Sequence, residues 1–174
     1  TNTGAIKMIK LILLGTLITI VMAGCSSNES QTTTLPDGSK ATVNTNRDGS
    51  GMTVQGNGTE AAIGTAAKIS EEQLHVPFYP GAQMVNEKSM FVKAASEESA
   101  LAYFTSKDEI EKIAEFYKEK LKGLEFTKFE NAGSVNMISK EYKDNNGGRV
   151  AISLSKKSAS EPVEIVIGWG KVSQ

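Results

Sequence analysis

Residues 149–155 read RVAISLS and residues 163–169 read VEIVIGW, and these two stretches decide the fold. In each of them an apolar side chain occurs at every second position, which is the period of a strand with one buried face. The alternating apolar residues are Val150, Ile152 and Leu154 in the first stretch, and Val163, Ile165, Ile167 and Trp169 in the second. The pattern therefore predicts two half-buried strands.

Further strands are predicted N-terminal to this pair, at residues 83–94, 99–105, 124–130 and 135–143. The sequence Asp-Asn-Asn-Gly-Gly at 144–148 has the composition of a hairpin turn. These segments extend the predicted sheet to about six strands.

One helix is predicted between the second and third of these strands. Ser106 and Glu109 have the spacing of a capping box, and Gly123 is placed to end the helix as the C′ residue. The helix carries one apolar face, made of Ile110, Ile113, Ala114, Tyr117 and Leu121. The order ββαββββ predicts an α+β fold, in which an antiparallel sheet of about 5–6 strands packs one face against one main helix.

The residues before the first of these strands predict a short helical turn and an ordered loop. Ser70 is a suitable cap, with Gln73 three residues later. The prolines at 77 and 80 exclude regular helix and central strand from residues 75–82. We expect Phe78 and Tyr79 in this loop to pack onto the core.

Short motifs in this region resemble a recurrent bacterial domain with a "YPGA" motif. The matching residues are VPFYPGA at 76–82, AYFT at 102–105 and IAEFY at 113–117. The resemblance covers residues 75–172 and implies an envelope domain that is often attached to lipoprotein signals and has no assigned activity. It implies no catalytic residue.

The N-terminal region has the layout of a secretory signal. Lys7 and Lys10 precede an apolar run, LILLGTLITIVM, at residues 11–22. The sequence Met-Ala-Gly-Cys at 22–25 resembles the lipobox of bacterial lipoproteins, with Met where the family prefers Leu. The resemblance implies cleavage between Gly24 and Cys25, and diacylglyceryl transfer to the Cys25 thiol. We expect Met8 to be the true start of the chain.

Residues 26–68 are rich in Ser, Thr, Asn and Gly and contain no aromatic residue, a composition typical of flexible spacers. We therefore expect a mostly disordered tether. The alternative is a small hairpin between residues 41–45 and 52–55, which would be marginal if isolated. The predicted organisation is a signal peptide (1–24), a lipid-anchored tether (25–69) and a globular domain (70–174).

The composition limits the classes of function. All eleven aromatic residues fall between Phe78 and Trp169, so the core is expected in the second half of the chain. The net charge is −1 and no basic block occurs, which disfavours nucleic-acid binding. The single cysteine excludes an intramolecular disulfide, and lipidation explains it.

No candidate catalytic or metal site stands out, and we predict neither a metal nor a cofactor. His75 is the only histidine, with Glu71 and Glu72 nearby as weak possible ligands. The adjacent acids Glu71-Glu72 and Glu97-Glu98 would have to serve any carboxylate chemistry. Trp169 lies between Gly168 and Gly170, where another backbone has room to approach. The candidate partner surface consists of Phe78, Tyr79, Trp169, Lys118 and Lys122.

The sequence favours a noncatalytic envelope lipoprotein that binds a partner protein or wall component. It would be held outside the cytoplasmic membrane by lipid on Cys25, or at the outer membrane of a two-membrane cell. Two alternatives remain open at this point: a small envelope hydrolase that uses carboxylates, and an accessory to a solute transporter. The sequence leaves the oligomeric state open.

Overall fold

A computed structural model describes residues 30–34, 38–56, 58–95, 97–131, 133–145 and 147–172. The predicted signal peptide (1–24), the cleavage site at Gly24 and the lipidation site at Cys25 lie outside the described residues.

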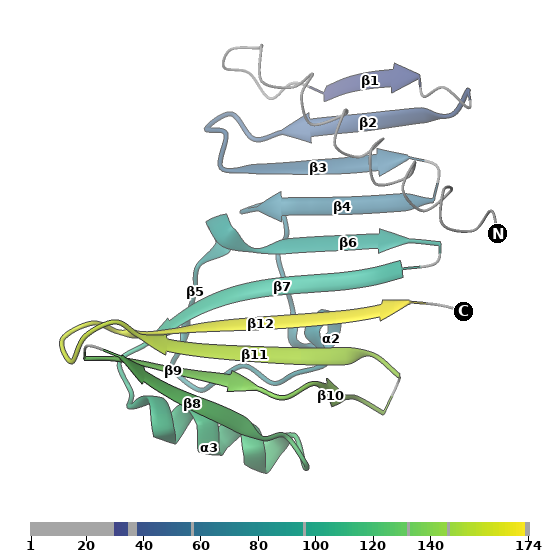
Figure 1. The fold of residues 1–174 in the computed structure, drawn as a ribbon. Coiled ribbons are helices and arrows are strands. Elements are labelled where there is room, and N and C mark those ends of the chain that lie inside the picture. Colours follow the sequence, from purple (N-terminus) through teal and green to yellow (C-terminus); the bar gives the residue numbers. More distant parts are fainter. Residues whose placement is uncertain are drawn as a thin grey trace.

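Within the described ranges, the chain forms one open sheet of twelve antiparallel strands (Figure 1). The strands are β1 (Ser30–Thr34), β2 (Lys40–Thr45), β3 (Gly51–Gly56), β4 (Thr59–Gly64), β5 (Gln83–Met84), β6 (Met90–Ala94), β7 (Glu97–Ser106), β8 (Phe126–Asn131), β9 (Ser134–Ser139), β10 (Tyr142–Lys143), β11 (Arg149–Lys156) and β12 (Val163–Val172). The order across the sheet is β1-β2-β3-β4-β6-β7-β12-β11-β9-β8, with β5 on β7 and β10 on β11. The helical elements are α2 (Glu71–Leu74), the 3₁₀ helix η2 (Asn86–Lys88) and α3 (Ile110–Lys120).

The predicted α+β fold, with 5–6 strands behind a flexible tether, is wrong. The segment expected to be a tether supplies β1 to β4, and β4 pairs with β6, so these strands continue the main sheet. The hairpin alternative is the one that forms, with Val43 opposite Val54. A hairpin that is marginal alone is stabilised when a neighbouring strand already offers a hydrogen-bonding edge.

Both ends of the predicted central helix differ from the structure. Ser106 is the last residue of β7, opposite Val163, and its hydroxyl accepts the Asp108 N–H at 3.2 Å. It therefore cannot cap the helix, which begins at Ile110 after Glu109 without a side-chain cap. The C-cap is Leu121 and the C′ residue is therefore Lys122, so Gly123, with a φ of +95°, lies one residue beyond the C′ position that was predicted for it.

Two predicted strands are interrupted. Residues 83–94 form β5, η2 and β6 instead of one strand, because Asn86–Lys88 makes a 3₁₀ turn that buries Ser89. Residues 135–143 divide into β9 and β10.

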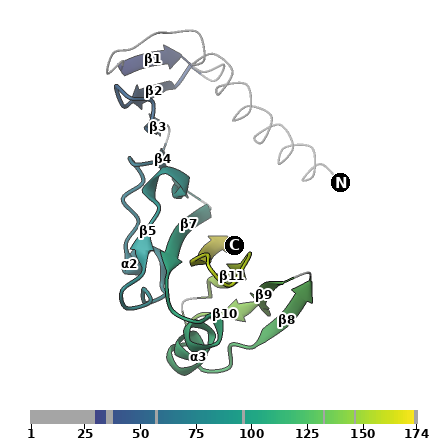
Figure 2. The ribbon, with the colours of Figure 1, turned by 90° about the vertical axis from the view of Figure 1, so that its left-hand side faces the viewer.

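The core lies between one face of the sheet and the two helices. The predicted apolar face of α3 is confirmed, since all five of its residues are buried. α3 contacts β9 and β11, and α2 contacts β7 and β12. Figure 2 shows both helices on the same side of the sheet, which bends so that β8 and β9 project toward the opposite side.

The loop at 75–82 is ordered by named contacts. The predicted Ser70 capping box is confirmed, and the Phe78 N–H donates to Glu71 Oε1 at 2.6 Å. Phe78 packs against Phe104 with ring centroids 4.8 Å apart, and the Tyr79 hydroxyl donates to Asp108 Oδ2 at 2.6 Å.

The predicted turn at 144–148 is joined to β12 by one carboxylate. Asp144 accepts the Gly148 N–H at 2.7 Å through one oxygen and the Trp169 Nε1–H at 2.8 Å through the other. Trp169 is 4% exposed, so its indole packs in the core and its one polar atom is satisfied.

Gly148→Ala tests this packing. A Cβ at Gly148 would overlap the Trp169 ring, so we expect the free energy of unfolding to fall by about 1–3 kcal/mol. Gly170→Ala is the matched control, because a Cβ there lies 3.8 Å from its nearest neighbour. Urea denaturation of the full chain measures both, and equal stability of the two variants would contradict the packing.

Tyr79→Phe tests the bond to Asp108. The Tyr79 hydroxyl, followed by Lys112, lowers the pKa of Asp108. A lowered carboxyl pKa stabilises the fold above the unfolded-state pKa of about 3.9, and this stabilisation is lost as pH falls through the folded-state pKa. The variant should therefore be less stable than the unmodified chain at neutral pH, with the difference closing in acid. Stability measured by urea denaturation as a function of pH checks this.

Tyr117→Phe removes a second buried tyrosine hydroxyl and serves as the comparison for Tyr79→Phe. The Tyr117 hydroxyl is buried with no hydrogen-bond partner among the described residues, and burial raises its pKa. We expect the unfolding free energy to stay the same or rise by up to about 1 kcal/mol, without the pH dependence. A loss as large as that of Tyr79→Phe would contradict this assignment.

Candidate functional site

The side of the sheet opposite the helices carries a second apolar surface. Cross-strand pairing places Met52, Ile63, Met90, Leu101, Gly168 and Ala151 in one continuous row on that side. We call the surface built around this row the open face. It consists of Met52, Val54, Ala61, Ile63, Met90, Val92, Ser99, Leu101, Tyr103, Phe129, Ile138, Ala151, Ser153, Val166, Gly168 and Gly170.

The large apolar side chains that remain exposed lie on the open face in two pairs, with β7, β12 and β11 between them. Among the described residues these are Phe129 (53% exposed), Ile138 (49%), Ile63 (39%) and Met90 (36%). Ile63 and Met90 are direct partners in the row. Ile138 lies opposite Ser153, and Phe129 lies diagonally from Ile138 on the neighbouring strand. Exposed apolar residues scattered singly need no explanation, whereas a contiguous patch indicates an interaction site.

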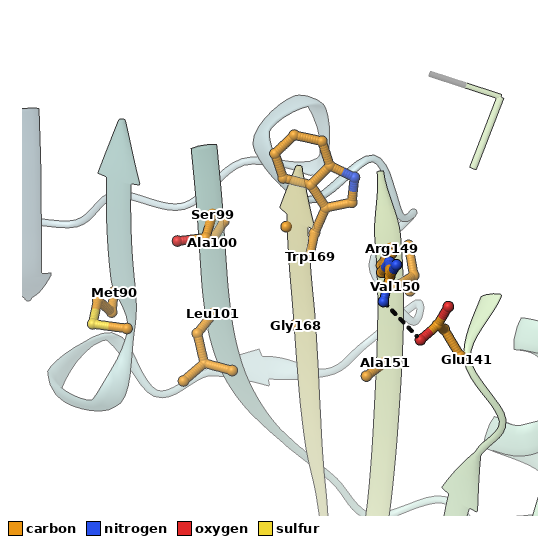
Figure 3. A pocket seen from close by; sticks show the side chains of 11 residues that line it. Met90, Ser99, Ala100, Leu101, Glu141, Arg149, Val150, Ala151, Gly168 and Trp169 are labelled. Carbon is orange, nitrogen blue, oxygen red and sulfur yellow. Dashed lines mark hydrogen bonds and ion pairs between the residues drawn. The ribbon is translucent and has the colours of Figure 1, made fainter. Parts of the chain in front are cut away.

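A groove of about 470 Å³ runs over β12 on the open face (Figure 3). Gly168 and Gly170 form its floor because they have no side chains. Met90, Ser99 and Leu101 lie along one side. Ala151, Arg149 and Glu141 lie along the other.

The fold itself does not require these two glycines. Neither has a positive φ, and a Cβ on Gly168 or Gly170 would come no closer than 3.6 Å to its neighbours. Gly64, by contrast, has a φ of +66° and lies against the backbone of Ser50. Glycine weakens a strand interior, and it often marks the place where a ligand or another backbone approaches closely. The lack of side chains at Gly168 and Gly170 leaves the groove open.

The charged groups at the groove cancel. Arg149 Nη1 lies 3.2 Å from Glu141 Oε2, and both side chains are exposed. An exposed ion pair of this kind contributes little to stability. The groove therefore suits an uncharged, apolar occupant.

A second hollow, of about 420 Å³, lies on the helix side of β4 and β6 and is polar. Glu60 and Glu98 flank Lys93 there, with Lys93 Nζ 3.9 Å from Glu98. Lys93 separates the two carboxylates and balances part of their charge.

The carboxylate pairs suggested by the sequence are not brought together for catalysis. Glu97 and Glu98 are adjacent in β7 and point to opposite faces of the sheet. Glu71 is engaged with the Phe78 N–H. Interactions with neighbouring donors lower the pKa values of Asp48, Asp108, Glu111 and Glu125, whereas a general acid needs a raised one.

The five residues of the sequence-predicted partner surface do not form one surface. Tyr79 and Trp169 are buried and Phe78 is half-buried, so all three pack in the core. Lys118 lies on α3, where it pairs with Glu115 at 3.5 Å, and Lys122 follows the end of that helix. His75 is exposed and stacks on Trp169, with ring centroids 4.4 Å apart.

Sequence reasoning missed the open face, although a signal for it was present. The intervening positions of the predicted strands, such as Ala151, Val166 and Leu101, are also apolar or small. Apolar residues on both faces of a strand are typical of a strand that is buried on both faces.

No protein-family model matches the chain, and the searches of curated proteins and of solved structures found no significant match. The described residues contain no group of three or more His, Cys, Asp or Glu side chains that could hold a metal ion. In the same part of the chain, no helix has the length and apolar character needed to cross a membrane.

Gly168→Val tests whether the groove is structural. A Cβ at position 168 makes only an ordinary contact, with the Leu101 side chain, and valine favours strands, so the unfolding free energy should stay the same or rise by up to about 1 kcal/mol. Urea denaturation measures the change. A loss of more than about 1 kcal/mol would show that the fold needs this glycine.

Proposed function

We propose that this chain is a noncatalytic, lipid-anchored envelope protein that binds a protein partner through the open face. The anchor is the Cys25 thiol of the lipobox-like sequence at 22–25. Lipidation with two acyl chains would attach the protein stably to a membrane.

The observation that carries the proposal is the exposed apolar surface around the Gly168 groove. Removing apolar surface from water stabilises a complex by about 25 cal/mol per Å². An exposed apolar patch is therefore a candidate binding surface. The patch surrounds a groove that stays open although a Cβ would fit at Gly168 and Gly170 in its floor. Both features are accounted for by a partner that reaches the backbone of β12.

The position of β1 limits how far the edge of the sheet would lie from the membrane. Ser30 begins β1 five residues after Cys25, and an extended chain spans at most about 3.5 Å per residue. The sheet therefore starts within roughly 18 Å of the proposed lipid. This edge of the sheet would therefore be held close to the membrane, with the groove over β12 six strands further across the sheet.

The carboxylate hydrolase has less support. Glu141 is the one carboxylate that lines the groove among the described residues, and Arg149 neutralises it. A transporter accessory would use the same open face and belongs to the binding proposal.

Photocrosslinking in native membranes tests the proposal. Leu101 is replaced by a photoreactive phenylalanine analogue in the full chain, and Glu115 on α3 is replaced in a control. We expect a discrete adduct from position 101, its loss in the Gly168→Val background, and none from position 115. Equal adducts from both positions, or none from 101, would overturn the proposal. Cys25→Ala should release the chain from the membrane fraction.

A further inference from the structure

We propose that Met90 is a site of reversible oxidation, and that its oxidation by a peroxide prevents binding at the open face. The inference rests on the proposed binding function and names how that binding is regulated. It follows from the exposure of the Met90 side chain, from its place beside the groove and from the small effect that its oxidation would have on the fold.

Met90 is the most exposed of the four methionines that the structure describes. It is 36% exposed, whereas Met137 is 7% exposed. Met52 and Met84 are half-buried. A dissolved oxidant must reach the sulfur atom, so we expect Met90 to react before the others.

The strand register keeps the Met90 side chain on the open face. Met90 lies opposite Ile63 on β4 and Leu101 on β7. The next residue of β6, Phe91, is 7% exposed and belongs to the core. Because neighbouring residues of a strand point to opposite faces, a buried Phe91 directs Met90 outward. The thioether cannot move into the core unless the whole strand changes register.

Met90 also lies at one side of the groove over β12, next to Leu101 (Figure 3). A partner that fills the groove and covers the row around Leu101 would contact the Met90 side chain. An unoxidised thioether is apolar and adaptable, so it suits such a contact. The same contact would shield the sulfur, and oxidation would therefore act on the chain while it is unbound.

Oxidation changes this contact from apolar to polar. The Met90 sulfur attacks one oxygen of the peroxide, the O–O bond breaks, and with hydrogen peroxide the products are the sulfoxide and water. The sulfur loses two electrons, and the peroxide gains them. The sulfoxide oxygen accepts hydrogen bonds from water, and covering it with an apolar group leaves it without a donor, which is unfavourable. The Met90 sulfoxide should therefore exclude an apolar partner.

The fold itself should tolerate this change. The sulfoxide of Met90 would remain in contact with water, whereas a sulfoxide at Met137, opposite Leu154, would place a polar group in the core. Sulfoxide reductases return the sulfoxide to the thioether. Two thiols supply the electrons and leave as a disulfide, and the oxygen leaves as water. Oxidation at Met90 is therefore reversible without unfolding of the chain.

Treatment of the purified full-length chain with hydrogen peroxide tests the site. Peptide mass spectrometry measures the sulfoxide at each methionine as a function of time. We expect Met90 to be oxidised at least fivefold faster than Met137, and the midpoint of urea denaturation to be unchanged once Met90 has reacted. Equal rates at the two positions, or a lowered midpoint, would overturn the proposal.

Photocrosslinking tests the consequence for binding. The chain with the photoreactive analogue at position 101 is oxidised at Met90 and added to solubilised native membranes from cells that lack the chain. We expect the adduct to fall at least tenfold, and to return after treatment with a sulfoxide reductase and a thiol. Met90→Leu is the matched control, because leucine is apolar and has no sulfur. This variant should give the same adduct with and without peroxide.

The outcomes separate the two proposals. An adduct that survives the oxidation of Met90 overturns the regulation and leaves the binding function standing. So does an adduct that peroxide removes equally from the Met90→Leu variant. The absence of any adduct from the untreated chain overturns the binding function, and the regulation with it.

Discussion

The structure depends on the register between β7 and β12. Ten residue pairs join these strands, from Val163 opposite Ser106 to Val172 opposite Glu97. A slip of one residue would turn every side chain to the other face. The observed register places Ile165, Ile167 and Trp169 against the helices, and it necessarily places Gly168 and Gly170 on the open face. The core and the candidate binding groove are therefore two consequences of one ladder of hydrogen bonds.

The same ladder explains the asymmetry of the molecule. Both helices lie on one side of the sheet, and the described residues offer nothing comparable on the other. An antiparallel sheet tolerates one solvated face when that face is polar. Here that face carries Phe129, Ile138 and Ile63, so the fold leaves an apolar surface to be covered from outside. The early start of β1 places one edge of the sheet near the proposed anchor, and the groove over β12 lies six strands further across the sheet.

Elements with strong local patterns were predictable, and elements defined by long-range pairing were not. The alternation in β11 and β12, the apolar face of α3 and the Ser70 cap are all visible in the sequence. Ser106 is a residue type that caps helices well, but its pairing with Val163 makes it the last residue of β7. Strands β1 to β4 are short and mix apolar with polar residues, and they join the main sheet through the pairing of β4 with β6. The groove was predictable only in part. The sequence indicates room for another backbone at Gly168 and Gly170, but it does not show that the apolar positions around them lie on one surface.

The most direct measurement is the reactivity of a cysteine at Leu101 in intact membranes. Leu101→Cys is treated with a water-soluble maleimide, beside Gln55→Cys on the opposite face. If a partner covers the open face, position 101 should react at least tenfold more slowly than position 55 in membranes. It should react at a comparable rate after denaturation in urea. Equal reactivity of the two positions in intact membranes would contradict the account.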